Sequence, residues 1–234
     1  MINITRFRSL PRVSALLPAL FLILIVVPFV GAAGSKEPYP ISPEHKTFEL
    51  SDPIPVDPRV KRGTLPNGLT YYVRENSKPA DEAVLRLVVF AGSILEDEDQ
   101  LGLAHFVEHM AFNGSKHFEK QELIDYLEST GMRFGKEINA FTGFDRTVYK
   151  LNVPANEPEV MDNAFQVLED WAHLISFDHK EIDKERGVIV EEWRLGRGAQ
   201  ARIRQEYFPV LFKGSRYAER LPIGEVEIIR NADY

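Results

Sequence analysis

The chain has 234 residues, of which 35 are acidic, 28 are basic and none is cysteine. Without cysteine there is no disulfide, no thiolate-bound metal and no lipid anchor on an N-terminal cysteine, so a metal would have to be bound by histidine and carboxylate. The formal net charge of −7 has the wrong sign for binding nucleic acid, and we expect no nucleic-acid partner.

The first 33 residues have the composition of a signal peptide. Basic residues precede a nearly continuous apolar run over residues 13–30, and Gly31-Ala32-Ala33 offers a cleavage site. An uncleaved membrane anchor is the alternative, because about 18 apolar residues are close to the minimum that spans a bilayer. Two prolines in the run favour the signal peptide, which predicts an exported protein, periplasmic or secreted, with no membrane attachment after its removal. Residues 34–58 contain six prolines and are interpreted as a linker.

The first elements of the domain that we place at residues 59–234 have β-type patterns. Pro66-Asn67-Gly68 predicts a turn that leads into a short strand over residues 69–74. A longer β-rich run covers residues 82–95, and the continuous apolar stretch 87–91 within it predicts a strand buried on both faces. The acidic residues 96–99 follow, and we interpret them as a solvated loop, although acidic residues before a helix also suit its dipole.

Residues 101–112 (LGLAHFVEHMAF) carry the strongest functional signal. His105, Glu108 and His109 have the spacing i, i+3, i+4, so they share one face of a helix. The other positions are mostly apolar, so the helix should be buried, and these polar groups are costly to bury without a partner. The arrangement His-x-x-Glu-His is typical of zinc hydrolases, with Glu108 as the general base on a zinc-activated water. The alternative is a helix with two core histidines and a chance glutamate.

The following elements alternate between helix and strand. The patterns predict an amphipathic helix at residues 118–130, strands at 134–141 and 147–153, and a long helix at 156–176. A further helix is expected to begin within residues 225–234. Residues 198–221 are basic and aromatic and are expected to be irregular or helical. We interpret His117 as a surface residue and His173 as a partner of a helix dipole rather than a ligand.

Residues 178–197 predict a second informative helix, with Asp178 as N-cap. Glu185 and Glu192 are seven residues apart and point the same way from an apolar stripe that contains Val188 and Ile189. Glu192 is therefore the candidate third metal ligand, and Glu185 would orient a ligand or the water. Glu191 is the rival ligand, and a surface helix with ordinary glutamates is the alternative to both.

The order and spacing of several motifs resemble the pitrilysin/insulysin family of zinc peptidases, the inverzincins, in their bacterial type. The resemblance covers residues 59–234 and includes GLTYYV, FAGS, GLAHFVEHMAFNG, NAFTGFDRTVY, ERGVIVEEW and LPIG. It implies one Zn²⁺ per chain, bound by His105, His109 and Glu192. It also implies that Glu108 is the catalytic base and that Glu185 is an auxiliary catalytic carboxylate.

The resemblance also implies a fold and partners. The expected fold is α+β, with helices packed on a mostly antiparallel sheet, and its edge strand at Asn139 and Ala140 would pair with the backbone of a peptide substrate. Family members use paired domains or subunits that close a chamber around the peptide. This chain stops at Tyr234, before the family's first domain is complete, so we expect a truncated N-terminal peptidase domain that needs a second domain or subunit.

The leading hypothesis from the sequence is a zinc-dependent endopeptidase that hydrolyses peptides or unfolded proteins. The alternative is a non-catalytic or truncated family subunit that acts as a binding or assembly partner. A metal-storage or transport protein is a third possibility, which would not need Glu108. Hydrolysis of a peptide in the presence and absence of chelator separates the first hypothesis from the other two.

Overall fold

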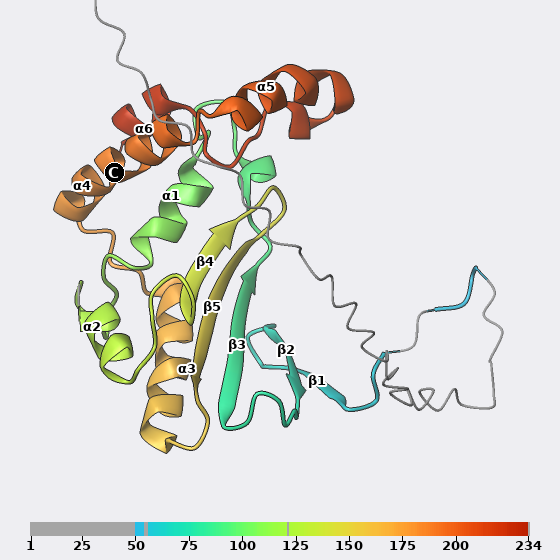
Figure 1. Cartoon of the computed structure of the whole chain (residues 1–234), viewed down its shortest axis with the longest axis vertical. Helices are drawn as coiled ribbons and strands as arrows, with labels where there is room; N and C mark the ends of the chain where they lie inside the picture. The colour runs from blue at the N-terminus through green and yellow to red at the C-terminus, as the bar shows by residue number, and fades with distance from the viewer. Residues whose placement is uncertain (1–49, 54–55, 121, 234) are drawn as a thin grey trace, which may run out of the picture. The chain divides into compact units, whose positions relative to one another are not determined.

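The computed structural model describes residues 50–53, 56–120 and 122–233. The signal peptide expected at residues 1–33 and most of the linker expected at 34–58 lie outside the described residues. Contacts divide the chain into residues 1–56 and 57–234, and the helices and strands below belong to the second unit (Figure 1). No helix within the described ranges is long and apolar enough to cross a lipid bilayer.

The described strands form two antiparallel sheets, whereas one mostly antiparallel sheet was expected from the family resemblance. β1 (Val60–Thr64) and β2 (Thr70–Arg74) form a hairpin across the predicted turn, although β1 was not predicted. β3 (Glu82–Val89), β5 (Thr147–Pro154) and β4 (Ile138–Thr142) form a three-stranded sheet in the order β3-β5-β4. β4 is therefore an edge strand of this sheet within the described part of the chain.

Helices cover the sheet on one face and extend beyond its end. They are α1 (Leu103–Met110), α2 (Glu122–Ser129), α3 (Pro158–His173), α4 (His179–Leu195), α5 (Ala199–Leu211) and α6 (Val226–Asn231). Figure 1 shows α3 along the three-stranded sheet and α1 between β4 and α4, which agrees with the contacts of α1. The predicted α+β fold, with helices on an antiparallel sheet, is confirmed.

Two clusters of buried side chains hold these layers together. The larger cluster joins α3 to the sheet and includes Val167, Trp171 and Leu151. Trp171 Nε1 also donates a hydrogen bond of 2.8 Å to the carbonyl oxygen of Ala111, which ties α3 to the end of α1. The smaller cluster joins α1, α4 and α6 through Phe106, Met110, Ile189 and Ile229. Because α1 is held from both sides, its orientation is fixed by packing.

Two predictions about the strands were wrong. The stretch 87–91 is not buried on both faces, because β3 alternates: Leu87 packs on the core, whereas Val88 and Phe90 are exposed. This is the pattern of an antiparallel strand that is covered on one face. The strand expected at 134–141 begins only at Ile138, because residues 133–137 form a tight loop in which Gly135 has a φ of +84°.

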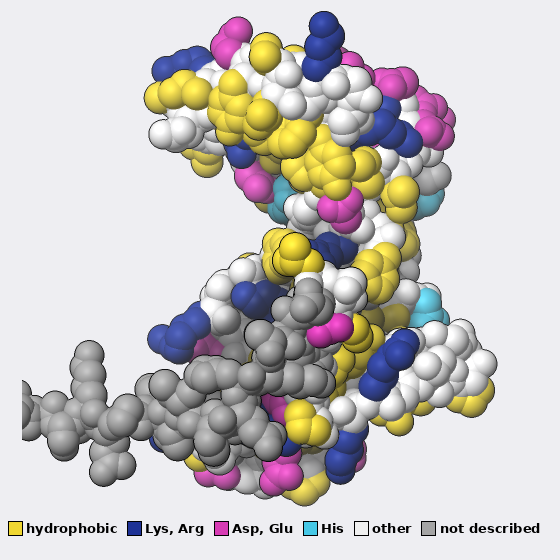
Figure 2. All heavy atoms as spheres, turned by 90° about the vertical axis from the view of Figure 1, so that its right-hand side faces the viewer, with side chains coloured by type: hydrophobic (Ala, Val, Ile, Leu, Met, Phe, Trp, Pro, Cys, Tyr) yellow, Lys and Arg dark blue, Asp and Glu magenta, His cyan; other side chains and the backbone are white. Residues whose placement is uncertain are grey.

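The segment 198–221, expected to be irregular or helical, contains α5. No residue of α5 is buried, and its large hydrophobic side chains at Ile203, Tyr207, Val210 and Leu211 are exposed. Figure 2 shows hydrophobic side chains gathered over the upper part of the face that carries this helix. The helix therefore forms without the tertiary burial that orders α1 and α3.

Candidate metal centre

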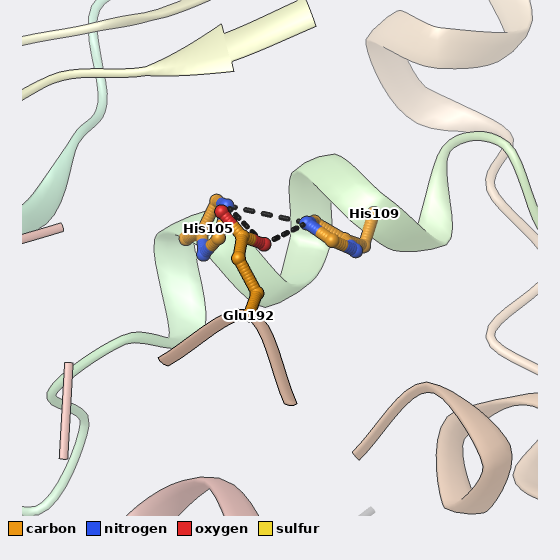
Figure 3. A group of neighbouring side chains, drawn as sticks. All are labelled: His105, His109 and Glu192. Carbon is orange, nitrogen blue, oxygen red and sulfur yellow. Dashed lines mark hydrogen bonds and ion pairs between the residues drawn. The ribbon is translucent and has the colours of Figure 1, made fainter. Parts of the chain in front are cut away.

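The two histidines of α1 and one glutamate of α4 converge at one point (Figure 3). His105 Nε2 lies 3.2 Å from His109 Nε2, as the i, i+4 spacing requires. Glu192 Oε2 lies 3.8 Å from the first of these nitrogens and 3.4 Å from the second. Within the described ranges, this is the group of histidines and carboxylates whose donor atoms are close enough to bind one metal ion.

The spacing of these donor atoms fits a single tetrahedral cation. Zn²⁺ binds imidazole nitrogen and carboxylate oxygen at about 2.0–2.2 Å, so the ligand atoms of a tetrahedral site lie about 3.3 Å apart. The observed separations of 3.2, 3.4 and 3.8 Å are close to this value. Two imidazoles and one carboxylate also leave a fourth position for water or substrate, which is the composition of a catalytic zinc site.

Packing of α4 against α1 brings Glu192 to the histidines. Asp178 caps α4 as predicted, because its side chain accepts hydrogen bonds from the backbone N–H groups of Lys180 and Glu181. Ile189 is fully buried in the cluster with Phe106 and Met110, which sets the rotation of the helix. Val188 was also expected to be buried, but it is exposed and lines the cavity of the site.

Glu192 and Glu191 differ in direction. The Glu192 side chain is 51 % exposed, so it lies at the cavity wall rather than on a buried stripe. Glu191, one residue earlier, forms an ion pair of 2.7 Å with Arg194 on the surface and is not part of the donor group. The structure therefore brings Glu192, and not Glu191, close to the two histidines.

Glu185 contacts His109 from the side opposite the donor group. Its Oε1 accepts a hydrogen bond of 2.7 Å from His109 Nδ1, and its Oε2 accepts one of 2.8 Å from Asn113 Nδ2. Because a carboxylate only accepts, Nδ1 carries the hydrogen and Nε2 is the nitrogen that faces the other donors. Burial alone would lower the pKa of His109, but the carboxylates of Glu185 and Glu192 outweigh it and raise this pKa to about 9.

His105 has a different environment from His109. Its Nδ1 is buried and has no hydrogen-bond partner among the described residues. Burial and the neighbouring His109 lower the pKa of His105, despite the opposing effect of Glu192. The lowered pKa favours the neutral imidazole, which is the form that binds a metal.

Glu108 lies on the same helix but points toward the sheet rather than into the donor group. It is 7 % exposed, and its Oε2 accepts a hydrogen bond of 2.5 Å from Thr142 Oγ1 on β4. Burial raises the pKa of Glu108, although the hydrogen bond from Thr142 opposes the rise. A carboxyl group with a raised pKa beside a metal site is suited to accepting and returning a proton.

The donor group opens into a cavity of about 760 Å³. Its walls carry apolar side chains from several elements, and Asn139 and Ala140 of β4 also line it. The N–H of Ala140 donates a hydrogen bond of 2.9 Å to Asn139 Oδ1, so the edge of β4 is closed here by a side chain of its own strand. The two residues expected to bind substrate therefore lie at the cavity, on an edge strand.

The acidic run 96–99, interpreted as a solvated loop, contains a buried residue that sequence analysis missed. Glu96 is 6 % exposed, and its carboxylate accepts hydrogen bonds from Gly102 N at 3.0 Å and Ala104 N at 2.8 Å. It caps α1, whose own N-cap residue Gly102 has no side chain to do so. The position of acidic residues before a helix was the available signal.

The two other histidines discussed in the sequence analysis, His117 and His173, lie outside the donor group. His117 is at the surface and its Nδ1 lies 2.7 Å from Asp170 Oδ1. His173 is the last residue of α3 and its side chain is 61 % exposed, 3.8 Å from Glu169. Sequence reasoning did not identify Asn113 and Thr142, because their partners Glu185 and Glu108 come close only in the folded chain.

Several proteins similar to this chain are named as zinc proteases or probable zinc proteases. It is 45 % identical over 187 residues to the "Probable zinc protease PqqL" of Haemophilus influenzae, an alignment that covers 79 % of this chain and 20 % of that protein. It is 44 % identical over 169 residues to a "Zinc protease PQQL-like" of Arabidopsis thaliana, with 72 % of this chain and 18 % of that protein covered. The chain thus spans about a fifth of the curated relatives it matches.

Solved structures show the same fold. The first half of the periplasmic protease PqqL from Escherichia coli superposes with a TM-score of 0.74 and 37 % identity, covering 76 % of this chain and 38 % of that one. Pitrilysin superposes with a TM-score of 0.61 and 26 % identity, covering 73 % and 17 % of the two chains. Residues 71–205 match the model of the insulinase family, peptidase family M16. The chain therefore belongs to the insulinase family of peptidases, family M16.

Proposed function

We propose that this chain is the metal-binding catalytic part of an exported zinc endopeptidase. The observation that carries the proposal is the convergence of His105, His109 and Glu192, with the buried carboxyl of Glu108 on the same helix. Membership of a peptidase family and relatives named as zinc proteases support it. The periplasmic location of the related Escherichia coli protease supports export, in line with the signal peptide expected from the sequence.

Each side chain has a separate role in the proposed reaction. Bound zinc would supply Lewis-acid chemistry, because it polarises a carbonyl group and lowers the pKa of water toward about 7. Glu108 takes a proton from the attacking water and returns it to the leaving amine, which is a role for a carboxyl group whose pKa is raised by burial. Glu185 holds His109 in the tautomer that offers Nε2 to the metal.

The edge of β4 is the proposed site for the substrate backbone. A peptide added as a further strand would replace the hydrogen bond between the Ala140 N–H and Asn139 Oδ1 with a main-chain bond of its own. Recognition through main-chain groups explains how such a site can accept many sequences. The chain superposes on one part of longer relatives, so a second domain or subunit is the proposed partner that completes the chamber.

The test is hydrolysis of an internally quenched peptide by the full purified chain. We expect cleavage that is lost with a zinc chelator and restored by added zinc. A chain that binds zinc but leaves the peptide intact would contradict its catalytic assignment and favour the alternative, a binding or assembly subunit. A chain that binds no zinc would contradict the proposed metal centre and, with it, the catalytic assignment.

A further inference from the structure

Asn113 lies four residues after His109, just beyond the end of α1, and is not part of the His-x-x-Glu-His spacing. Its Nδ2 donates hydrogen bonds to Glu185 Oε2 at 2.8 Å and to the carbonyl oxygen of His109 at 3.2 Å. The side-chain nitrogen of asparagine has two N–H groups, so both of them are used. One partly buried side chain therefore connects the end of α1 to the carboxylate on α4.

Both oxygens of Glu185 are fixed by residues that follow each other closely in the chain. Oε1 accepts from His109 Nδ1 and Oε2 accepts from Asn113 Nδ2. The terminal torsion of a glutamate side chain is soft, so a carboxylate held at one oxygen can rotate. The second hydrogen bond, from Asn113, removes this freedom. The Glu185 side chain is only 12 % exposed, so little water is available to take the place of that bond.

We infer that Asn113 is a positioning residue of the metal centre. By fixing the plane of the Glu185 carboxylate, it directs His109 Nε2 toward the point shared with His105 and Glu192. The inference rests on the proposed zinc site and deepens it. Asn113 acts through Glu185, since its N–H groups point at that carboxylate and at the backbone of His109.

The first test is the zinc affinity of the full chain carrying Asn113→Leu, measured by competition with a chromophoric chelator at one fixed pH. Leucine has a similar shape but no N–H group. We expect an affinity about tenfold lower, the lower end of the losses seen when a group that orients a metal ligand is removed. An affinity within about twofold of the unsubstituted chain would overturn the inference.

The matched control is Asn163→Leu on α3. Asn163 is also partly buried, and its Nδ2 donates a hydrogen bond of 2.7 Å to the hydroxyl of Tyr126. The same chemical change is thus made at a position far from the donor group in the sequence and on another helix. Its zinc affinity should not change, although its thermal stability should fall as that of Asn113→Leu does.

The second test exchanges the amide and the carboxylate. In Glu185→Gln alone, one end of the new amide meets a group of the same polarity, either His109 Nδ1 or Asn113 Nδ2. Adding Asn113→Asp lets the new amide nitrogen donate to position 113 while its oxygen accepts from His109. The double variant should therefore bind zinc several-fold more tightly than Glu185→Gln alone. If Asn113 only stabilised the fold, the double variant would bind zinc more weakly than Glu185→Gln.

A double variant that binds zinc no more tightly than Glu185→Gln would overturn the inference, and this comparison also decides it if Asn113→Leu does not fold. These readouts do not depend on hydrolysis. Zinc binding that responds to Asn113 in a chain that cleaves no peptide would support the inference and contradict the peptidase proposal. Peptide cleavage by a chain whose zinc affinity does not change with Asn113→Leu would support the peptidase proposal and contradict the inference.

Discussion

Two histidines near the end of α1 are each held by a carboxylate from a later helix, yet only one lies in the metal centre. His109 Nδ1 lies 2.7 Å from Glu185 on α4, and His117 Nδ1 lies 2.7 Å from Asp170 on α3. The Asp170 carboxylate also accepts from Ser115 Oγ and from the backbone N–H of His117. The first pair joins α1 to α4, and the second joins the loop after α1 to α3.

The pairs differ in what surrounds the histidine. Nε2 of His109 faces a second imidazole nitrogen and a carboxylate oxygen, whereas His117 belongs to no such group within the described part of the chain. Burial opposes ionisation of Asp170, but hydrogen bonds from Ser115 and His117 outweigh it and lower the pKa of this carboxyl. A carboxylate–imidazole pair alone therefore stabilises packing, and a metal centre needs further donor atoms that converge on the free nitrogen.

The largest expected effect is on the base beside the metal centre. Glu108→Gln should lower kcat/KM for peptide hydrolysis by about 10²–10⁴-fold, the usual contribution of a general base. Zinc should be retained, because Glu108 is not part of the donor group. Peptide cleavage and zinc content of the same preparation check this. Cleavage at the rate of the unsubstituted chain would refute the role of Glu108.

The second effect separates adjacent glutamates on α4. Glu192→Ala should reduce zinc affinity by more than about 100-fold, because it removes a ligand rather than a group that orients one. Glu191→Ala is the control, since Glu191 pairs with Arg194 at the surface. Chelator competition measures both. Equal zinc affinity in the two variants would move the third ligand elsewhere.

The third effect should appear in stability alone. Asp170→Asn leaves the buried hydroxyl of Ser115 and the partly buried backbone N–H of His117 facing an amide nitrogen in place of an oxygen, and should lower the free energy of unfolding by about 1–3 kcal/mol. Zinc affinity should stay the same. Denaturant unfolding is the measurement, with Asp162→Asn on the exposed side of the same helix as control. A loss of zinc affinity as large as that of Glu192→Ala would abolish the distinction between the two pairs.

The smallest effect is the pH dependence of that stability difference. The pKa of Asp170 is lowered in the folded chain, so its ionised form stabilises the fold. This contribution is complete above the unfolded pKa of about 3.9 and is lost as the pH falls through the lower folded value. The stability gap between the unsubstituted chain and Asp170→Asn should thus be constant near neutral pH and shrink below about pH 4. A gap that widens in acid would show that Asp170 is not stabilised as a carboxylate.

Local geometry made much of the site predictable. The spacing of His105, Glu108 and His109 decides which face of a helix they occupy, whatever the rest of the chain does. The same reasoning predicted that Glu185 and Glu192 point the same way from α4, and both contact His109 in the structure. Asp178 caps this helix, as was also predicted. The strands at 69–74 and 147–153 were also predictable from their alternating pattern and turn residues, whereas the antiparallel sheet was expected from the family resemblance.

Two of the errors share one cause, which is that they depended on neighbours distant in the sequence. The apolar stretch 87–91 predicted burial on both faces, but burial depends on what packs against each face of β3. The acidic run 96–99 looked like a solvated loop, although the backbone N–H groups at the start of α1 bind the buried Glu96. The position of the acidic run before a helix indicates that a cap can form, but not which of the four residues is buried.

The chemistry of the site follows from the sequence alone: two imidazoles and a carboxyl at helical spacing, no cysteine, and motifs that resemble a peptidase family. Which groups complete the site depends on how the folded chain packs. Packing of Ile189 against α1 brings Glu192 within 3.4 Å of His109 Nε2. Packing of α1 against β4 brings Glu108 to Thr142, and packing of α4 against α1 brings Glu185 to Asn113. Helical spacing fixes directions within one element, whereas distances between elements are set by the core that packs them together.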